Sequence, residues 1–355
     1  MTIRIAIVLA LLGSALSGCG AAPYYWQAAS GQWELWQKSR PIDDWLADPA
    51  ADEHLKARLK QVQEIRAFAS RELALPDNGS YRSYADLGRP YVVWNVFAAP
   101  ELSLQPKEWC FPVAGCVGYR GYFAEPDALT FAEGLKGEGY DTYVGGVPAY
   151  STLGWFDDPV PSTVIGYADT EIARLVFHEL AHQVLYVPGD TTFNESFATA
   201  VEQEGVKRWV KAQKAPEQLE QFEQAQARRR QFIALVLEYQ GKLTAIYASP
   251  ASDDEKRALK AQTFGSMRSD YADLKQSWGM RSGYDGWFAG PLNNAQIASV
   301  ASYTQQVSAF QALLAQEQGD MRRFYAVAKQ LAKLPKEDRD KELEVLAAQM
   351  TGATR

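Results

Sequence analysis

The sequence predicts an α+β fold, in which a small mixed β-sheet lobe is followed by a mostly helical lobe with a cleft between them. Between residues 80 and 167, short runs rich in β-branched and aromatic residues are bounded by Gly and Pro, which is typical of strands. From Asp169 onward, apolar residues recur every three or four positions, which is typical of helices. We therefore assign residues 31–167 to the first lobe and residues 168–355 to the second.

The composition is that of an ordinary folded protein. Of the 355 residues, 47% are hydrophobic and 22% are charged, and the net charge is -7. Because there is no excess of Lys and Arg to replace the counterions of a polyanion, we do not expect nucleic acid as a partner.

Residues 1–18 are predicted to be an export signal, because one basic residue is followed by an apolar run too short to span a bilayer. The signal ends in "LSGC", which resembles the lipobox of bacterial lipoproteins. The resemblance implies that the thiol of Cys19 carries a lipid and that residues 19–30 form a tether. Gly20 follows where an Asp would imply retention in the inner membrane, so the resemblance implies the outer membrane, with the protein facing the periplasm. The alternative is that Cys19 only ends the signal helix.

In the first lobe, helices are expected to about residue 74, because apolar residues there are spaced by three and four. One further helix is expected over residues 125–139, between the second and third of four predicted strands. Those strands cover residues 90–100, 115–123, 140–146 and 162–167.

In the second lobe, a helix is expected over residues 169–186, with Asp169 or Thr170 as its N-cap. A second helix is expected over residues 191–213. A long polar helical pair and a last set of helices follow, over residues 216–247, 252–278 and 293–350.

Two other segments of this lobe stand out. The loop over residues 279–294 is rich in Gly and aromatic residues and is expected to line the cleft. The basic run "QARRRQ", residues 226–231, is expected to be a solvated helix face.

Cys110 and Cys116 are the two cysteines that remain if Cys19 carries lipid. An even number in an exported chain suggests a disulfide, and the Pro and Gly residues between them permit the tight turn that the bridge needs. The alternative is a pair of free buried thiols.

The sequence "HELAH" places two of the three histidines, His178 and His182, four residues apart on a predicted helix. On a helix these positions lie on one face about 6 Å apart, so both imidazoles can reach one ion. Glu179 lies on the adjacent part of that face, where its carboxylate can act as the general base. This is the arrangement of zinc proteases, so Zn²⁺ is the expected ion. The alternative is a core helix whose histidines only form hydrogen bonds.

The third histidine, His54, lies in a charged helix and is expected at the surface, which leaves a carboxylate as the third ligand. The pair "FHELAH" and "FNESFA" resembles the gluzincins, zinc peptidases whose third ligand is a Glu on a following helix. The resemblance implies a zincin-like fold with Glu195 as that ligand. A capping box with Thr192 is the alternative role of Glu195. Glu202 and Asp190 are the further candidate ligands or hydrogen-bonding partners of the imidazoles.

Nearly all of the mature chain resembles a family of bacterial lipoproteins described as predicted aminopeptidases, through segments such as "WCFPVAGCVGYRGYF" and "GVPAYSTLGWFDDP". The resemblance implies a zinc-dependent aminopeptidase that hydrolyses peptides in the periplasm. A zinc endopeptidase is one alternative. The other is a noncatalytic envelope lipoprotein in which a structural zinc site supports binding of a partner protein.

The resemblance also implies how a peptide would be held. An extended substrate lies along an edge strand, and residues 146–156 are the candidate, with an ordinary connecting strand as the alternative. Because no His is spare, a Tyr is needed to stabilise the oxyanion, and the candidates are Tyr271, Tyr284 and Tyr303. The candidate carboxylates for binding a free α-amine are Asp157, Asp158 and Glu133.

Overall fold

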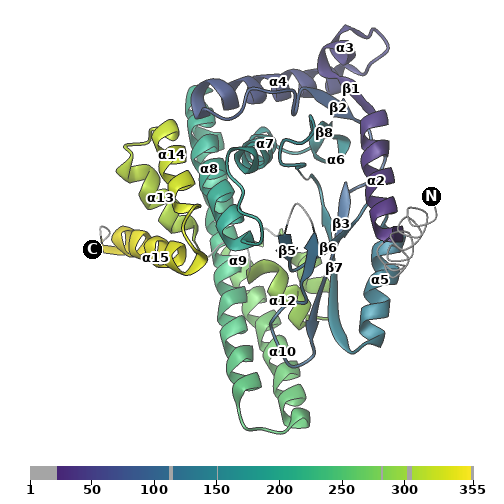
Figure 1. Cartoon of the computed structure of the whole chain (residues 1–355), viewed down its shortest axis with the longest axis vertical. Coiled ribbons are helices and arrows are strands. Elements are labelled where there is room, and N and C mark those ends of the chain that lie inside the picture. The colour runs from purple at the N-terminus through teal and green to yellow at the C-terminus, as the bar shows by residue number, and fades with distance from the viewer. Residues whose placement is uncertain (1–21, 112–114, 150, 281–282, 302–305, 353–355) are drawn as a thin grey trace, which may run out of the picture.

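The computed structural model describes residues 22–111, 115–149, 151–280, 283–301 and 306–352 (Figure 1). The fold is mixed α+β and mostly helical. The helices are α2 (Ala22–Gln37), α3 (Ile42–Ala47), α4 (Glu53–Leu73), α5 (Glu125–Gly137), α6 (Ser162–Ile165), α7 (Asp169–Val184), α8 (Thr191–Ala212), α9 (Pro216–Ala248), α10 (Asp253–Ser277), α11 (Asp285–Ala289), α12 (Asn294–Ala301), α13 (Val307–Gln316), α14 (Met321–Leu331) and α15 (Lys336–Gly352). The strands are β1 (Ser39–Pro41), β2 (Ser83–Ala85), β3 (Val93–Pro100), β4 (Trp109–Phe111), β5 (Gly115–Val117), β6 (Arg120–Tyr122), β7 (Tyr140–Val147) and β8 (Val160–Pro161).

The main sheet is antiparallel and has the strand order β6-β3-β7. Its central strand β3 is almost entirely buried, as expected for a strand whose two faces are both covered. Val96 and Ala98 pack against Ala128 and Leu135 of α5, which covers one face. Two smaller sheets, β1-β2-β8 and the hairpin β4-β5, complete the β structure.

The largest core surrounds α7 and α8. On one side, Leu59 and Ile65 of α4 pack in the same cluster as Phe177 of α7. On the other side of α8, the ring of Phe197 stacks on that of Phe324, with centroids 5.6 Å apart. Figure 1 shows α13, α14 and α15 on the side of α8 that faces away from the strands. This core therefore joins helices from both sides of residue 168, the predicted lobe boundary.

The helices α9 and α10 form a hairpin that extends away from the rest of the molecule (Figure 1). The buried side chain of Asn294 links this hairpin to the sheet. Its amide nitrogen donates to the backbone carbonyls of Pro100 at 3.0 Å and Glu101 at 2.8 Å, and its oxygen accepts from Tyr247 of α9 at 2.7 Å. A salt bridge of 2.6 Å between Lys260 and Asp141 connects α10 to β7.

Most predicted elements are confirmed, including strand β7, helix α5 and the helices α7 to α10 and α12 to α15, whereas the short helix α11 lies in the segment predicted as a loop. The strand predicted over residues 162–167 is wrong, because this segment forms the short helix α6 and a turn. Val164 of α6 is fully buried, and Arg58 of α4 donates to the carbonyl of Ile165 at 3.0 Å. These tertiary contacts outweigh the strand preference of β-branched residues.

Residues 22–30 of the predicted tether belong to helix α2. The side-chain amide of Gln27 in α2 donates a hydrogen bond to the carbonyl of Gly121 at 3.3 Å and accepts one from the backbone nitrogen of Phe123 at 3.1 Å. The helix is thus held against strand β6. Cys19 lies outside the described residues. Among the helices of the described ranges, none is both long and apolar enough to cross a membrane.

Candidate metal centre

Helix α7 carries the "HELAH" motif and is held by one buried face. Ile172, Val176 and Leu180 are fully or almost fully buried, which follows from their helical spacing. The predicted N-cap is wrong, because Ala168 occupies that position without a side-chain bond. His178 and His182 lie on the opposite face, and their Nε2 atoms are 3.1 Å apart.

Glu195 comes from the first turns of α8 and reaches both imidazoles. Its carboxylate oxygens lie 3.3 Å from Nε2 of His178 and 3.6 Å from Nε2 of His182. One ligand atom from each of the three residues lies within 4.8 Å of the others, so this group could hold a metal ion. The alternative role of Glu195 in a capping box with Thr192 is not seen, because Asp190 is the N-cap of α8 and accepts from the backbone nitrogen of Phe193.

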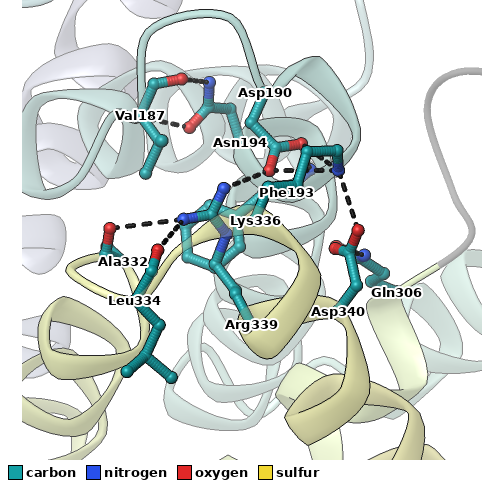
Figure 2. A network of polar contacts seen from close by, with 10 residues as sticks. All are labelled: Val187, Asp190, Phe193, Asn194, Gln306, Ala332, Leu334, Lys336, Arg339 and Asp340. Atoms are coloured by element: carbon teal, nitrogen blue, oxygen red, sulfur yellow. Dashed lines mark hydrogen bonds and ion pairs between the residues drawn. The ribbon is translucent and has the colours of Figure 1, made fainter.

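The loop between α7 and α8 is closed by Asn194, the residue before Glu195 (Figure 2). The oxygen of its side-chain amide accepts from the backbone nitrogen of Val187 at 2.7 Å, and the amide nitrogen donates to the carbonyl of Val187 at 2.8 Å. This double hydrogen bond fixes the start of α8 relative to the end of α7, and with it the position of Glu195.

Asp190 is directed to the C-terminal helix α15 (Figure 2). Its carboxylate forms a buried salt bridge of 2.6 Å with Arg339 of α15 and lies 3.4 Å from Lys336. Burial would raise the pKa of Asp190, but the hydrogen bond from Arg339 prevails and lowers it. The structure thus gives Asp190 the role of anchoring α8, whereas the sequence suggested a partner of the imidazoles.

Glu202 is the buried partner of His178. It is fully buried two turns after Glu195, and its Oε2 lies 2.9 Å from Nδ1 of His178 and 3.2 Å from Arg174. Burial raises the pKa of Glu202, but Arg174 and His178 lower it to about 2. Because Glu202 is therefore ionised, Nδ1 of His178 must donate the hydrogen bond, which leaves Nε2 directed toward Glu195.

The two histidines differ in charge. Burial alone would lower the pKa of His178, but hydrogen bonds with Glu195 and Glu202 raise it to about 10. In His182, burial lowers the pKa to about 4, so this imidazole is neutral at physiological pH. Nδ1 of His182 is buried without a hydrogen-bond partner among the described residues. A metal ion held by these residues would therefore have to displace the proton of His178.

Glu179 faces a cavity of about 760 Å³ that also contains His178, His182 and Glu195. Burial raises the pKa of Glu179 to about 7, and the charge of His178 opposes this rise. A carboxylate with this pKa can both accept and release a proton near neutral pH. The wall opposite α7 and α8 is formed by the main sheet and its loops, including Asn95, Tyr119, Gly121, Phe123 and Gly146.

Of the predicted tyrosines, Tyr271 and Tyr284 are described, and neither lines this cavity. Tyr271 donates to Asp285 at 2.7 Å inside the packing of α10 and α11. Tyr284 stacks on Phe232 of α9, with ring centroids 3.9 Å apart, and lines a different cavity. Tyr303 lies outside the described residues.

Three tyrosines that the sequence did not single out line the cavity instead, namely Tyr24 of α2, Tyr119 and Tyr186, and the last two lie near the histidines and Glu195. Burial raises the pKa of Tyr119, and Glu195, Tyr186 and Glu179 raise it further. Burial also raises the pKa of Tyr186, whose ring centroid lies 6.2 Å from that of His182. Both hydroxyls therefore keep their protons at neutral pH and can donate hydrogen bonds. Tyr186 could have been suspected, because it lies four residues after His182 and at the end of the same helical pattern.

The disulfide between Cys110 and Cys116 is present and joins strands β4 and β5. This hairpin borders the cavity, where Phe111 and Val117 contribute to the lining. Gly115 has a φ of 74°, and a Cβ on it would lie 2.6 Å from the backbone nitrogen of Gly189. Glycine is therefore required where the hairpin meets the loop between α7 and α8.

The segment predicted as the edge strand is a strand only at its start. β7 ends at Val147, and the residues after it form a loop that still lines the cavity through Pro148, Ala149, Ser151 and Leu153. The strand β7 itself lies at an edge of its sheet, next to β3.

The carboxylates suggested for an α-amine are not among the described residues that line the cavity. Glu133 is exposed on α5 and pairs with Lys136 at 3.0 Å. Asp158 is 2% exposed, and its Oδ2 accepts from the backbone nitrogen of Thr152 at 2.8 Å. Asp157 lies against Gly79.

A family model described as "Putative aminopeptidase" matches residues 23–343, which include α7, α8 and the strands that face them. Searches of curated proteins and of solved structures found no match. Because the family model covers most of the sequence, the chain belongs to the family described as "Putative aminopeptidase".

Proposed function

We propose that the protein is a zinc-dependent peptidase of the aminopeptidase type. One observation carries the proposal: Nε2 of His178, Nε2 of His182 and the carboxylate of Glu195 converge in the cavity that also holds Glu179. The arrangement of these residues on α7 and α8 is that of the gluzincins, so a zincin-like fold is part of the proposal. The family match supports hydrolysis of peptides.

The three ligand residues fit a zinc ion. Their nitrogen and oxygen atoms are separated by 3.1, 3.3 and 3.6 Å. A tetrahedral site with bonds of about 2.1 Å has ligands about 3.4 Å apart, close to these separations. Two imidazoles and one carboxylate are also a donor set typical of catalytic zinc, with the fourth position left for solvent.

When bound, the zinc ion would lower the pKa of a water molecule and polarise the scissile carbonyl. The side chains of the protein have separate tasks. Glu179 accepts the proton of the attacking water and delivers it to the leaving amine. Glu202 holds His178 in the orientation that presents Nε2. Tyr119 donates its hydroxyl hydrogen to the oxyanion that develops on the substrate.

Substrate would enter along the sheet side of the cavity. Gly146 lies near the end of β7. A Cβ at this position would lie 2.2 Å from the ring of Tyr91, so there is no room for a side chain between the strand and this ring. A peptide backbone beside β7 would lie across the cavity from the metal ligands.

We further propose that lipidated Cys19 anchors the protein to the outer membrane, facing the periplasm. The sequence "LSGC" supports this. Metabolic labelling with a radioactive fatty acid should mark the wild-type protein and not a Cys19→Ala variant. An unlabelled wild-type protein would contradict the anchor.

The activity is tested with the domain that follows residue 21, expressed without its signal. Its zinc content and its hydrolysis of free and N-acetylated peptides are measured together. Zinc with cleavage of only the free-amine peptides is the expected result. Cleavage of the acetylated peptides would identify an endopeptidase, and zinc without any cleavage would contradict a catalytic role.

A further inference from the structure

We propose that a second cavity, next to the metal centre, binds the C-terminal carboxylate of a short peptide substrate. This cavity, which we call the arginine pocket, has a volume of about 670 Å³ and is bordered by Arg174 of α7 and by Arg228 and Arg229 of α9. The inference rests on the proposed peptidase activity and adds the class of substrate.

The arginine pocket adjoins the cavity of the metal centre. Arg174 and Arg229 line both cavities. Arg174 is also the residue that donates to Glu202, the partner of His178. A substrate in the cavity of the metal centre therefore lies beside the side chains of Arg174 and Arg229, which also border the arginine pocket.

The pocket has more positive than negative charge among the residues described. Arg174 is paired with Glu171 at 2.9 Å and with Glu202 at 3.2 Å. Arg229 comes no closer than 3.7 Å to Glu202, which is too long for a hydrogen bond. Arg228 has neither a salt bridge nor a hydrogen bond within the described ranges. Three guanidinium groups thus face two carboxylates, and one positive charge is left for a ligand.

The walls of the pocket favour a carboxylate. Phe232 and Tyr284 stack at 3.9 Å and form an apolar surface beside the arginines. An ion pair that is partly shielded from water by such a surface is stronger than one in bulk solvent. The planar guanidinium group binds a carboxylate through two parallel hydrogen bonds. Arg228 and Arg229 are adjacent in sequence, on the part of α9 that borders the pocket.

The spacing along α7 sets the length of the substrate. Arg174 precedes His178 by about one helical turn and Glu171 precedes it by about two, so these two pocket residues lie about 6 Å and about 10 Å from His178 along the axis of α7. An extended peptide advances about 3.3 Å per residue. A carboxylate in the pocket therefore belongs to a residue two or three positions after the scissile bond, which selects tripeptides and tetrapeptides.

The test compares trialanine with trialanine amide as substrates of the wild-type domain and of two variants. Arg228→Gln removes the unpaired charge, and Arg230→Gln is the matched control, because Arg230 is exposed on the same helix and does not line the pocket. We expect kcat/KM of the wild type to fall by about 10- to 100-fold on amidation, as for the loss of hydrogen bonds to a charged group. Arg228→Gln should abolish most of this difference, and Arg230→Gln should preserve it.

Equal hydrolysis of both peptides by the wild type would overturn the pocket while leaving the peptidase intact. An amidated peptide with Glu as its third residue distinguishes the source of the carboxylate. If the Glu side chain restores kcat/KM in the wild type but not in Arg228→Gln, the pocket recognises a carboxylate. If it restores kcat/KM equally in both, the proposal is overturned.

Binding of the same peptides to a Glu179→Gln variant, measured by calorimetry, separates the pocket from the activity. If the wild type hydrolyses nothing but trialanine still binds this variant about 10-fold more tightly than its amide, the pocket stands and the peptidase proposal fails. Equal binding of the two peptides overturns the pocket.

Discussion

Glu202 carries a full negative charge inside the protein, and its neighbours explain why this charge is stable there. Its carboxylate lies 2.9 Å from Nδ1 of His178 and 3.2 Å from Arg174. The attraction of these groups exceeds the cost of burial, and the pKa of Glu202 falls to about 2. The same contacts orient His178, so Glu202 both stabilises its own buried charge and holds the imidazole of a candidate metal ligand in place.

Replacing Glu202 by Gln should weaken metal binding. The neutral amide removes the charge that fixes the tautomer of His178, so we expect the dissociation constant for zinc to rise by about 10- to 100-fold. Competition with a chromogenic chelator at pH 7 measures this constant. Glu204→Gln is the control, because Glu204 lies on the same helix but pairs with Arg208 at 2.7 Å. Equal zinc affinity in wild type and Glu202→Gln would contradict the role of Glu202.

Replacing Tyr119 by Phe should lower kcat by about 100-fold with little change in KM, because the hydroxyl acts only on the oxyanion. Steady-state kinetics with a free-amine peptide measure both constants. Tyr271→Phe should not change kcat, since that hydroxyl donates to Asp285 away from the cavity. An unchanged kcat in Tyr119→Phe would remove Tyr119 from the mechanism.

At the scale of elements, the position of α8 decides whether Glu195 meets the histidines. Asn194 fixes the loop before Glu195, and Asp190 fixes the first turn through Arg339 of α15 (Figure 2). Both partners of this salt bridge are only 4% exposed. The C-terminal helix therefore contributes to the metal centre without touching it.

Replacing Asp190 by Asn should lower the free energy of unfolding by about 3 kcal/mol at pH 7, since Arg339 is left as an uncompensated buried charge. The pKa of Asp190 is lowered by folding, so its contribution is fully present above its unfolded pKa, about 3.9, and is lost as the pH falls through the lower folded pKa. The difference between wild type and variant should therefore shrink below about pH 4.

Urea denaturation at pH 7 and at successively lower pH values measures this difference. Asp338→Asn is the control on α15, the helix that carries Arg339, because Asp338 is exposed and lies 3.9 Å from Lys341. A difference between wild type and Asp190→Asn that stays constant from pH 7 to below pH 3 would rule out ionisation of Asp190 as its source.

At the scale of the whole molecule, the sequence predicted the α+β class, the two helices of the metal centre and the convergence of His178, His182 and Glu195. Helical spacing brings the two histidines together without help from the rest of the fold. Predicting Glu195 also required the next helix, α8, and the polar residues at its start indicate in the sequence where that helix begins. The disulfide followed from the number of cysteines and their short separation.

Other features depend on contacts between distant segments and could not be predicted in this way. Tyr119 lines the cavity from the segment between β5 and β6, two strands that belong to different sheets. The basic run on α9 looked like a solvated face, yet Arg228 and Arg229 border a cavity that α7 and α12 complete. Asp190 caps a helix and binds Arg339, a residue 149 positions away in the sequence.

The most direct test of the metal centre compares two carboxylate variants, Glu179→Gln and Glu195→Gln, by zinc content and by hydrolysis of a free-amine peptide. Glu179 is the proposed base and Glu195 the proposed ligand. We predict that Glu179→Gln retains about the zinc content of the wild type and loses at least about 100-fold in kcat, whereas Glu195→Gln loses both zinc and activity. Full turnover in Glu179→Gln, or undiminished zinc binding in Glu195→Gln, would contradict this assignment.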